Sequence, residues 1–546
     1  MQRKVIHVVE IISVVCLLVF SGVERASGEA TWKPVIGIPD PPFGISEVAP
    51  PLPNPWTSDV SGFYYVQAGG GNSGNGYPGS PRSTIPTTLS AGSVVILAGT
   101  YNQNHEGGAA ITMNGTASQP VFIRGTSDAV RPTITQKWEV GGSYFILEYL
   151  NARWANSSGN GKLLFGGDHG VVRHSDFKGD LGKGVGGVST GGTYNVIWNN
   201  YIHDFGDVNA IDDQDNHGIA VGPNTSNLWI VGNEIARCSG DGIQINAGSI
   251  SAQATTHHIY VGRNNSHHNK QTGAWCKQAV DVIFSENQFH GHRASGSSAG
   301  DGTGGQYGPS YFWIMFNDIY DNEGGVKIAS TSDLGNGTER FIIGNKIHNI
   351  HKQSNYREDS WEVAAVSIWS SVNTYIIGNT MWDIDSGINS PASGKVDIIN
   401  NIIDSPSASA GNTIWFDTSS QASASAMDYN LLKNTVKIIW GDRVRRNLSN
   451  FQSTFSKGSH SISTDDPKFV NAAAGDFNLQ AGSPALDKGV QHSVYATFLN
   501  RYGLNIEKDI AGAPRPRGAG WDIGAYEGSG ALPLRRPNPP TVLEVK

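Results

Sequence analysis

Short segments of alternating apolar and polar residues recur along this chain, and many of them run directly into an asparagine. Trp229-Ile-Val-Gly232, Phe341-Ile-Ile-Gly344 and Tyr375-Ile-Ile-Gly378 are each followed by one. The same pattern, an asparagine followed two residues later by a side chain that is usually apolar, occurs eight times at steps of 21 to 34 residues. The eight asparagines are Asn200, Asn233, Asn264, Asn287, Asn317, Asn345, Asn379 and Asn400.

A repeat of this length, made of short strands and turn residues, is typical of a solenoid whose coils bury one face by stacking on their neighbours. Asparagine tolerates turn conformations, and its amide can bond to the equivalent amide one coil away. The pattern therefore predicts an all-β parallel β-helix with an internal asparagine ladder. The alternative is an antiparallel protein in which asparagine marks hairpins, but hairpins favour Asn-Gly loops and strands spaced about 8 to 12 residues apart.

Composition agrees with a turn-rich β protein, since the 546 residues include 68 glycines and only 16% charged residues. A solenoid core grows along one axis, so the length of this chain does not indicate how many domains it has. The formal net charge of -8 disfavours nucleic-acid binding and requires any attraction to an acidic ligand to be local.

The first 28 residues combine Arg3 and Lys4 with a short apolar stretch and then small residues, which predicts a signal peptide and a secreted protein. No other apolar stretch is long enough to span a membrane, so a free monomer without membrane contact is expected. Residues 29–55 form a Pro-rich linker or arm, 56–530 the β-helix with a C-terminal closure from about 464, and 531–546 a Pro-rich tail. Cys238 and Cys276 are too few for a disulfide scaffold, and Cys276 is expected to be a buried thiol.

Residues that point outward from the strands are the candidates for ligand binding, because successive side chains in a strand alternate. Alternation places the apolar residues of four strands inside and predicts an outward row of Gln244, Lys277, Lys327 and Trp369, with Trp275 beside it. Amides and ammonium groups bind hydroxyls and carboxylates, and indole faces stack on sugar rings. We expect these five residues to line a groove for an extended, anionic sugar chain.

Half of the 16 histidines lie between residues 257 and 352. They include His290 and His292, which Arg293 follows directly, and the residues 294–307 after them predict a flexible groove wall. We expect His290 to bind substrate, and His292 and Arg293 to transfer protons or bind anions beside the lysines. The alternative is that several of these histidines are solvated turn residues.

Acidic residues cluster just upstream, on successive predicted coils. Asp212, Asp213, Asp215 and Asp241 could supply the oxygen ligands that Ca²⁺ prefers, and His217 in the same segment is a further substrate-binding candidate. They could equally cap turns, and no calcium-loop motif is present.

The C-terminal region carries a connected signature: Asp466 to Asn471, Gly475 to Gly489 and Asp522-Ile-Gly-Ala-Tyr-Glu527. It resembles the closure of secreted bacterial right-handed β-helix proteins. The resemblance implies a right-handed helix, and many proteins of that group are carbohydrate-active, including polysaccharide lyases, epimerases and glycosidases. Fold analogy does not choose among them.

A lyase acting on a uronic-acid polymer by β-elimination is the first hypothesis. Lys277 would be the base, Arg293 and His292 would bind the carboxylate or protonate the leaving oxygen, and Asp241 with Asp213 would hold Ca²⁺. An aspartate region followed one coil later by a lysine is similar to β-helix pectate lyases that use a lysine base. Their usual double-Asp turn is replaced here by Ser239-Gly-Asp-Gly242.

Two alternatives remain at this point. The order Asp241, His290-Gly-His292 and Lys327 resembles in degraded form the motifs of polygalacturonases, which implies a hydrolase using Asp212, Asp213 and Asp241 as acid and base. A secreted adhesin or carbohydrate-binding solenoid would keep the groove without any chemistry.

Overall fold

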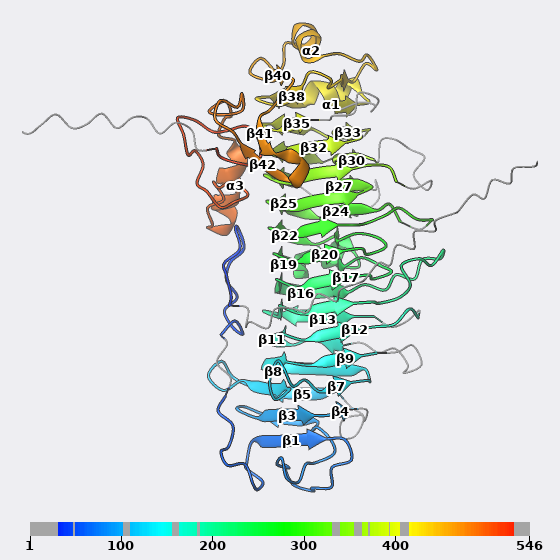
Figure 1. Cartoon of the computed structure of the whole chain (residues 1–546), viewed down its shortest axis with the longest axis vertical. Coiled ribbons are helices and arrows are strands. Elements are labelled where there is room, and N and C mark those ends of the chain that lie inside the picture. The colour runs from blue at the N-terminus through cyan, green and yellow to red at the C-terminus, as the bar shows by residue number, and fades with distance from the viewer. Residues whose placement is uncertain are drawn as a thin grey trace, which may run out of the picture. The chain divides into compact units, whose positions relative to one another are not determined.

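Each turn of the chain contributes up to three short strands, and the turns stack into a parallel β-helix (Figure 1). The computed structural model describes residues 31–528 except 47–49, 102–109, 155–162, 183–185, 297, 330–338, 354–362, 370–371, 392–393 and 405–413. The predicted signal peptide (1–28) and the tail (531–546) lie outside the described residues. From Trp32 onward the chain is one unit.

The strands of successive coils pair in parallel and form three faces, which we call the groove face, the second face and the third face. The groove face contains the first part of β8 (Trp138–Glu148), the first part of β16 (Ile219–Val231), β2 (Thr88–Ser90), β5 (Ile111–Asn114), β10 (Leu163–Phe165), β13 (Val188–Thr193), β18 (Ile243–Asn246), β21 (Ala274–Lys277), β24 (Asp301–Gln306), β27 (Gly324–Ala329), β30 (Val366–Trp369), β33 (Ile388–Ser390), β36 (Ile414–Phe416) and β39 (Ile438–Trp440).

The second face contains the last parts of β8 and β16 together with β1 (Phe63–Gln67), β3 (Val94–Ala98), β6 (Val121–Arg124), β11 (Asp168–Arg173), β14 (Val196–Trp198), β19 (His257–Gly262), β22 (Val280–Ser285), β25 (Ser310–Met315), β28 (Glu339–Ile343), β31 (Asn373–Ile377), β34 (Val396–Ile399) and β37 (Ala426–Asp428).

The third face contains β4 (Thr100–Tyr101), β7 (Thr133–Ile134), β9 (Asn151–Arg153), β12 (Asp176–Lys178), β15 (Tyr201–His203), β17 (Glu234–Ala236), β20 (Asn265–His267), β23 (Gln288–His290), β26 (Asp318–Asn322), β29 (Lys346–Ile350), β32 (Thr380–Ile384), β35 (Ile402–Asp404), β38 (Leu431–Lys433) and β40 (Ile462–Thr464).

Helical turns and one antiparallel pair complete the fold. They are α1 (Ser419–Ala424), α2 (Leu448–Phe455), α3 (Ser493–Tyr502), the 3₁₀ turns Ile250–Thr255 and Ala472–Ala474, and the pair β41 (Phe469–Asn471) with β42 (Asp476–Leu479). None of the helices in the described part of the chain combines the length and apolar character needed to cross a bilayer.

The predicted asparagine ladder runs along the bend between the second and third faces. Asn233 is a typical member: its Oδ1 accepts from the backbone N–H and Nδ2 of Asn200, both at 3.0 Å, and its own Nδ2 donates to Asn264 Oδ1 at 3.0 Å. The same bonds continue from coil to coil through Asn264, Asn287, Asn317, Asn345, Asn379, Asn401 and Asn430.

The prediction of Asn400 as a ladder residue was wrong by one position, and the ladder continues one coil further than predicted, to Asn430. In the preceding coil Gly378, with φ of +66°, turns the chain just before Asn379, and Asn400, with φ of +60°, takes the place of that glycine. Asn401 therefore enters the ladder, with none of its surface exposed, while Asn400 bonds to the backbone of Val490 in the C-terminal segment. Asparagine can fill either role because it tolerates the left-handed region better than other residues with a side chain.

The solenoid interior is filled by stacked apolar side chains that alternate inward along each strand, such as Ile243, Ile245, Val326 and Ile328, all at most 1% exposed. Cys276 points into this core and is a free, buried thiol, as the alternation predicts.

The predicted flexible loop 294–307 was wrong in its second half. Asp301–Gln306 is β24, a groove-face strand that pairs with β21 on one side and β27 on the other. Its sequence, Asp-Gly-Thr-Gly-Gly-Gln, lacks the apolar alternation of a strand, and backbone pairing with two neighbours overrides that weak propensity.

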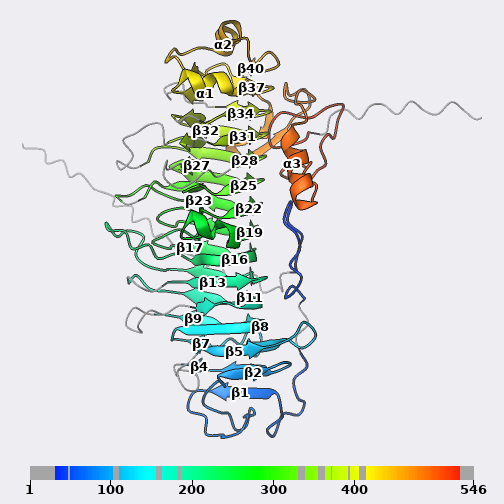
Figure 2. The same cartoon turned by 180° about the vertical axis from the view of Figure 1, so that it is seen from behind.

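Segments from both ends of the chain cover the outside of the second face (Figures 1 and 2). Residues of the Pro-rich segment bond to it directly: Ser285 Oγ donates to Ile36 O at 2.7 Å, and Trp229 Nε1 donates to Pro39 O at 2.7 Å. Further along, Tyr502 of α3 donates to Asp281 Oδ1 at 2.7 Å. This face is therefore apolar on its outer side as well and is occupied by the chain itself.

We predict that Asn401→Ala destabilises the protein by about 3 kcal/mol or more, because the buried backbone N–H and Nδ2 of Asn379 lose their acceptor, and each unpaired buried group costs about 1–3 kcal/mol. Asn400→Gly keeps the left-handed backbone accessible and removes only the bonds to Val490, so it should cost about 1 kcal/mol. Urea unfolding of the two variants measures the difference. Equal losses would contradict the assignment of Asn401 to the ladder.

Candidate functional site

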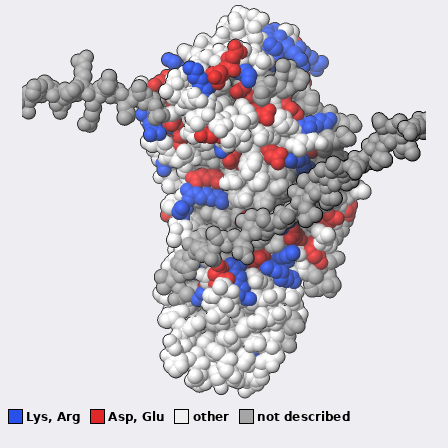
Figure 3. Space-filling model, in the orientation of Figure 1, with Lys and Arg blue, Asp and Glu red and all other residues white. Residues whose placement is uncertain are grey.

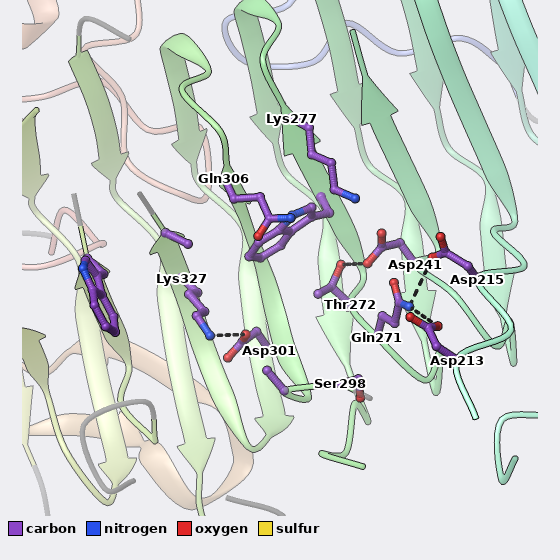
Figure 4. A pocket seen from close by; sticks show the side chains of 14 residues that line it. Asp213, Asp215, Asp241, Gln271, Thr272, Lys277, Ser298, Asp301, Gln306 and Lys327 are labelled. Atoms are coloured by element: carbon purple, nitrogen blue, oxygen red, sulfur yellow. Dashed lines mark hydrogen bonds and ion pairs between the residues drawn. The ribbon is translucent and has the colours of Figure 1, made fainter. Parts of the chain in front are cut away.

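A groove with a volume of about 420 Å³ lies on the groove face between β18 and β30 (Figure 4). Seven of the residues selected from the sequence line it: Asp213, Asp215, Asp241, Trp275, Lys277, Lys327 and Trp369. They come from five coils and are brought together by stacking alone.

The strand register arranges the outward residues in two rows rather than the single row predicted. Gln244 lies opposite Trp275, which lies opposite Gly304, which lies opposite Lys327. The second row contains Asn246, Lys277 and Gln306, and continues through Ala329 to Trp369. The sequence prediction mixed the two rows because it omitted β24 and could not fix the offset between coils.

The floor of the groove is formed by the indole of Trp275, which is 8% exposed although it faces outward. It lies against Gly304 of the next coil: a Cβ placed on Gly304 would come within 2.7 Å of the Trp275 ring. Glycine at this position leaves room for a flat aromatic surface. Trp369, at the other end, is 53% exposed and stands at the rim.

Asp241 is a buried carboxylate at the N-terminal end of the groove. It accepts hydrogen bonds from Thr272 Oγ1 at 2.7 Å and from Gln244 Nε2 at 3.1 Å, and its backbone N–H donates to His217 Nδ1 at 2.9 Å. Burial raises the pKa of Asp241, opposed by His217 and the two hydrogen bonds. Gln244 and His217, predicted to bind substrate, thus hold this carboxylate in place.

The two lysines have different surroundings. Lys327 Nζ lies 4.0 Å from Oδ2 of the buried Asp301. No described residue forms a hydrogen bond or ion pair with the Lys277 ammonium. Its positive charge acts to lower the pKa of Asp241, against the larger effect of burial. Lys277 is therefore the cation most open to a ligand.

Seven groove residues were not selected from the sequence: Gln271, Thr272, Ser298, Ala299, Asp301, Gln306 and Ala329. Asp301 and Gln306 fall in the segment interpreted as a loop, where no alternation marks an outward position. Gln271 and Thr272 immediately precede β21, at the edge of the groove, and only the neighbouring outward Trp275 could have drawn attention to them.

His290, His292 and Arg293 are not among the residues that line the groove. His290 belongs to β23 on the third face and stacks between His267 and Tyr320. His292 is 0% exposed and bonds through Nδ1 to Asn269 O at 3.1 Å, and Arg293 pairs with Asp321 at 2.7 Å. A bend of the chain separates this corner from the outward lysines of the groove face.

The aspartates proposed as calcium ligands do not fit a cation. Gln271 Nε2 donates to Asp213 Oδ1 at 3.0 Å and to Asp215 Oδ1 at 3.2 Å, and Lys270 Nζ donates to Asp212 O at 2.6 Å. The amide donor faces the carboxylates of Asp213 and Asp215, while the Lys270 ammonium faces a backbone carbonyl. Among the described residues, no three His, Cys, Asp or Glu side chains are arranged to hold a metal.

Residues 141–307 match the family described as a right handed beta helix region. The predicted right-handed parallel β-helix is confirmed. No curated protein matches the sequence.

Solved structures with a similar path of the chain include three carbohydrate-active proteins. Pectate lyase Pel9A is 14% identical, with 85% of this chain and 96% of that chain covered and a TM-score of 0.38. The mannuronan C-5 epimerase AlgE4 A-module of Azotobacter vinelandii is 16% identical, with coverages of 63% and 83% and a TM-score of 0.34.

The third is the PL6 family alginate lyase AlyGC, which is 13% identical, with 69% of this chain covered and a TM-score of 0.41. The chain spans about half of that lyase, 51% of its length. These likenesses concern the fold and assign no activity.

We predict that His292 supports stability rather than chemistry. Burial lowers the pKa of His292 to about 3, so the folded protein binds fewer protons than the unfolded one between about pH 6.5 and pH 3. Stability contributed by the neutral ring is present above that window and is lost as the pH falls through it, by up to about 1.4 kcal/mol per pH unit.

His292→Gln should remove that part of the slope in urea unfolding measured from pH 7 to pH 4. An unchanged slope in His292→Gln, or a loss of ligand binding in the folded variant, would contradict the structural role.

Proposed function

We propose that this protein is a secreted polysaccharide lyase that cleaves a uronic-acid-containing polymer by β-elimination. The observation that carries the proposal is the groove itself. Along one straight face, it places two lysines, two tryptophans and several amides on successive coils about 4.8 Å apart, which suits an extended, acidic sugar chain.

Binding is assigned to the aromatic floor and to Lys327. Sugar rings stack on Trp275 and, at the rim, on Trp369. Lys327, paired with Asp301, is held as a cation and binds a substrate carboxylate. Gln306, which lies between the two lysines in Figure 4, donates through its amide to the carboxylate of the uronate under attack.

Lys277 is the base. It takes the proton from C5 of the uronate, the electron pair of that C–H bond forms the C4–C5 double bond, and the C4–O4 bond breaks. The leaving oxygen takes a proton from water in the open groove. A lysine acts as a base in its neutral form, and a chain bound along the groove would exclude water from the reacting atoms.

Hydrolysis is the second candidate, favoured by one observation. Asp241 is a buried carboxyl with a raised pKa, which suits a general acid, and Asp301 lies two coils away at about 10 Å. Against this, both oxygens of Asp241 already accept hydrogen bonds. A groove that binds without cleaving is the third reading.

The deciding measurement is ultraviolet absorbance of the unsaturated uronate, with a parallel reducing-sugar assay, on pectate, alginate, glycosaminoglycans and neutral glucans. We expect absorbance on an acidic polymer, unaffected by chelator. Lys277→Ala should reduce kcat by about 10²–10⁴-fold, because the base is lost. New reducing ends without absorbance, removed in Asp241→Asn, would establish hydrolysis instead.

Lys277→Arg separates charge from proton transfer, because arginine stays protonated. It should retain binding of the polymer in affinity electrophoresis while losing elimination. Lys352→Ala, at an exposed lysine that does not line the groove, is the matched control and should behave as the unaltered protein. Full activity in Lys277→Arg would remove Lys277 from the role of base.

A further inference from the structure

A second groove of about 640 Å³ continues the first toward the N-terminal end of the same face. The two grooves meet between β18 and β21. Gln244 and Asn246 of β18 line the second groove, and their partners in β21, Trp275 and Lys277, line the first. Gly222 of the preceding coil also lines the second groove. The register carries this row onward through Gly191 and Gly166 to Gly141. The row spans about 24 Å from Lys277 to Gly141, five coil spacings.

The backbone does not require glycine at these outward positions. None of Gly141, Gly166, Gly191 and Gly222 has a left-handed φ, and a Cβ would meet its nearest neighbour at 3.6 to 3.8 Å, an ordinary contact. The adjacent Gly142, Gly167 and Gly192 differ, with φ between +90° and +119° and clashes at 2.0 to 2.2 Å. Glycine inside a strand costs about 0.5–1 kcal/mol and often marks close approach of a ligand.

An acceptor inside the groove is also left open. Gln244 is 7% exposed and uses its Nε2 on Asp241, and no described residue donates a hydrogen bond to its Oε1. That oxygen can accept a further hydrogen bond, and a sugar hydroxyl in the groove would supply the donor. This observation is independent of the glycines and marks the junction of the two grooves.

The two grooves differ in charge. The first groove holds Lys277 and Lys327 beside four aspartates, whereas no described lysine or arginine lines the second, whose one charged residue, Glu139 at its far end, has its Oε2 at 3.7 Å from Lys137 Nζ. Leu164 and Ala220 add apolar surface to its floor. Among the described residues, an acidic sugar there would meet no unpaired cation, so this half of the face suits uncharged rings.

We infer that the substrate is a mixed polymer: an acidic residue lies at Lys277, and uncharged pyranose residues occupy the glycine-floored groove on its N-terminal side. The uncharged residues are either neutral sugars or uronates whose carboxyl group is blocked as an ester. This inference rests on the proposed function for the position of the acidic residue, and it concerns binding along the whole face.

The test is affinity electrophoresis and kcat/KM on three polymers: pectate, the same chain methyl-esterified in part, and hyaluronan, in which acidic and uncharged residues alternate. The protein should favour the esterified chain or hyaluronan over pectate, and which of the two it favours identifies the source of the uncharged residue. Gly166→Phe fills the groove and should lower affinity for the favoured polymer about tenfold, with less than about twofold change for pectate.

Gly71→Phe is the matched control, because Gly71 has open space around it, no left-handed φ and no place in either groove. It should leave all three affinities unchanged. If thermal unfolding shows that Gly166→Phe does not fold, Gly191→Phe repeats the test one coil further along.

Preference for pectate, equal effects of Gly166→Phe on every polymer, or no binding to any of them would overturn the inference. Binding that Gly166→Phe weakens selectively, without any cleavage, would uphold the uncharged groove and reject the lyase. Cleavage with Lys277-dependent absorbance but no effect of Gly166→Phe would uphold the lyase and reject the uncharged groove.

Discussion

Hydrogen bonding between buried asparagine amides is the constraint on which the rest of this structure depends. Each ladder residue accepts from the preceding coil and donates to the next, so the bend between the second and third faces is held at one strand spacing from Asn200 to Asn430. A buried amide without its partner is costly, and a coil that slipped by one residue would leave several unpaired. The ladder thereby fixes the register of the coils.

Because the register is fixed, residues that are distant in sequence lie in rows on the surface. Asp241, Lys277 and Lys327 lie 36 and 50 residues apart along the chain and line one groove on the folded protein. A net charge of -8 does not prevent cations from gathering locally: stacking brings Lys277 and Lys327 into one groove, where two of the four aspartates, Asp241 and Asp301, are buried and bonded or paired. Figure 3 shows charges of both signs over the middle and upper coils, while the lowest coils are almost bare of them.

The three faces of the solenoid differ in what covers them. The second face is covered by the Pro-rich segment and α3, which bury its outer aromatic residues such as Trp229 and Trp313. The third face carries stacked rings, among them His267, His290 and Tyr320, against neighbouring coils. The groove face keeps glycines, amides and lysines open to solvent, and both grooves lie on it. Its straightness, which follows from regular stacking, suits a linear polymer.

The sequence by itself determined the all-β solenoid, the ladder from Asn200 to Asn379, and the inward or outward direction of side chains such as Cys276 and Lys277, because these follow from local alternation and a regular repeat. It did not determine which outward residues share a row, that Asp301–Gln306 is a strand, or that His292 is buried on the far side of a bend. Those depend on the offset between coils and on where each bend falls. Loop lengths vary from coil to coil, so only the bonded stack decides them.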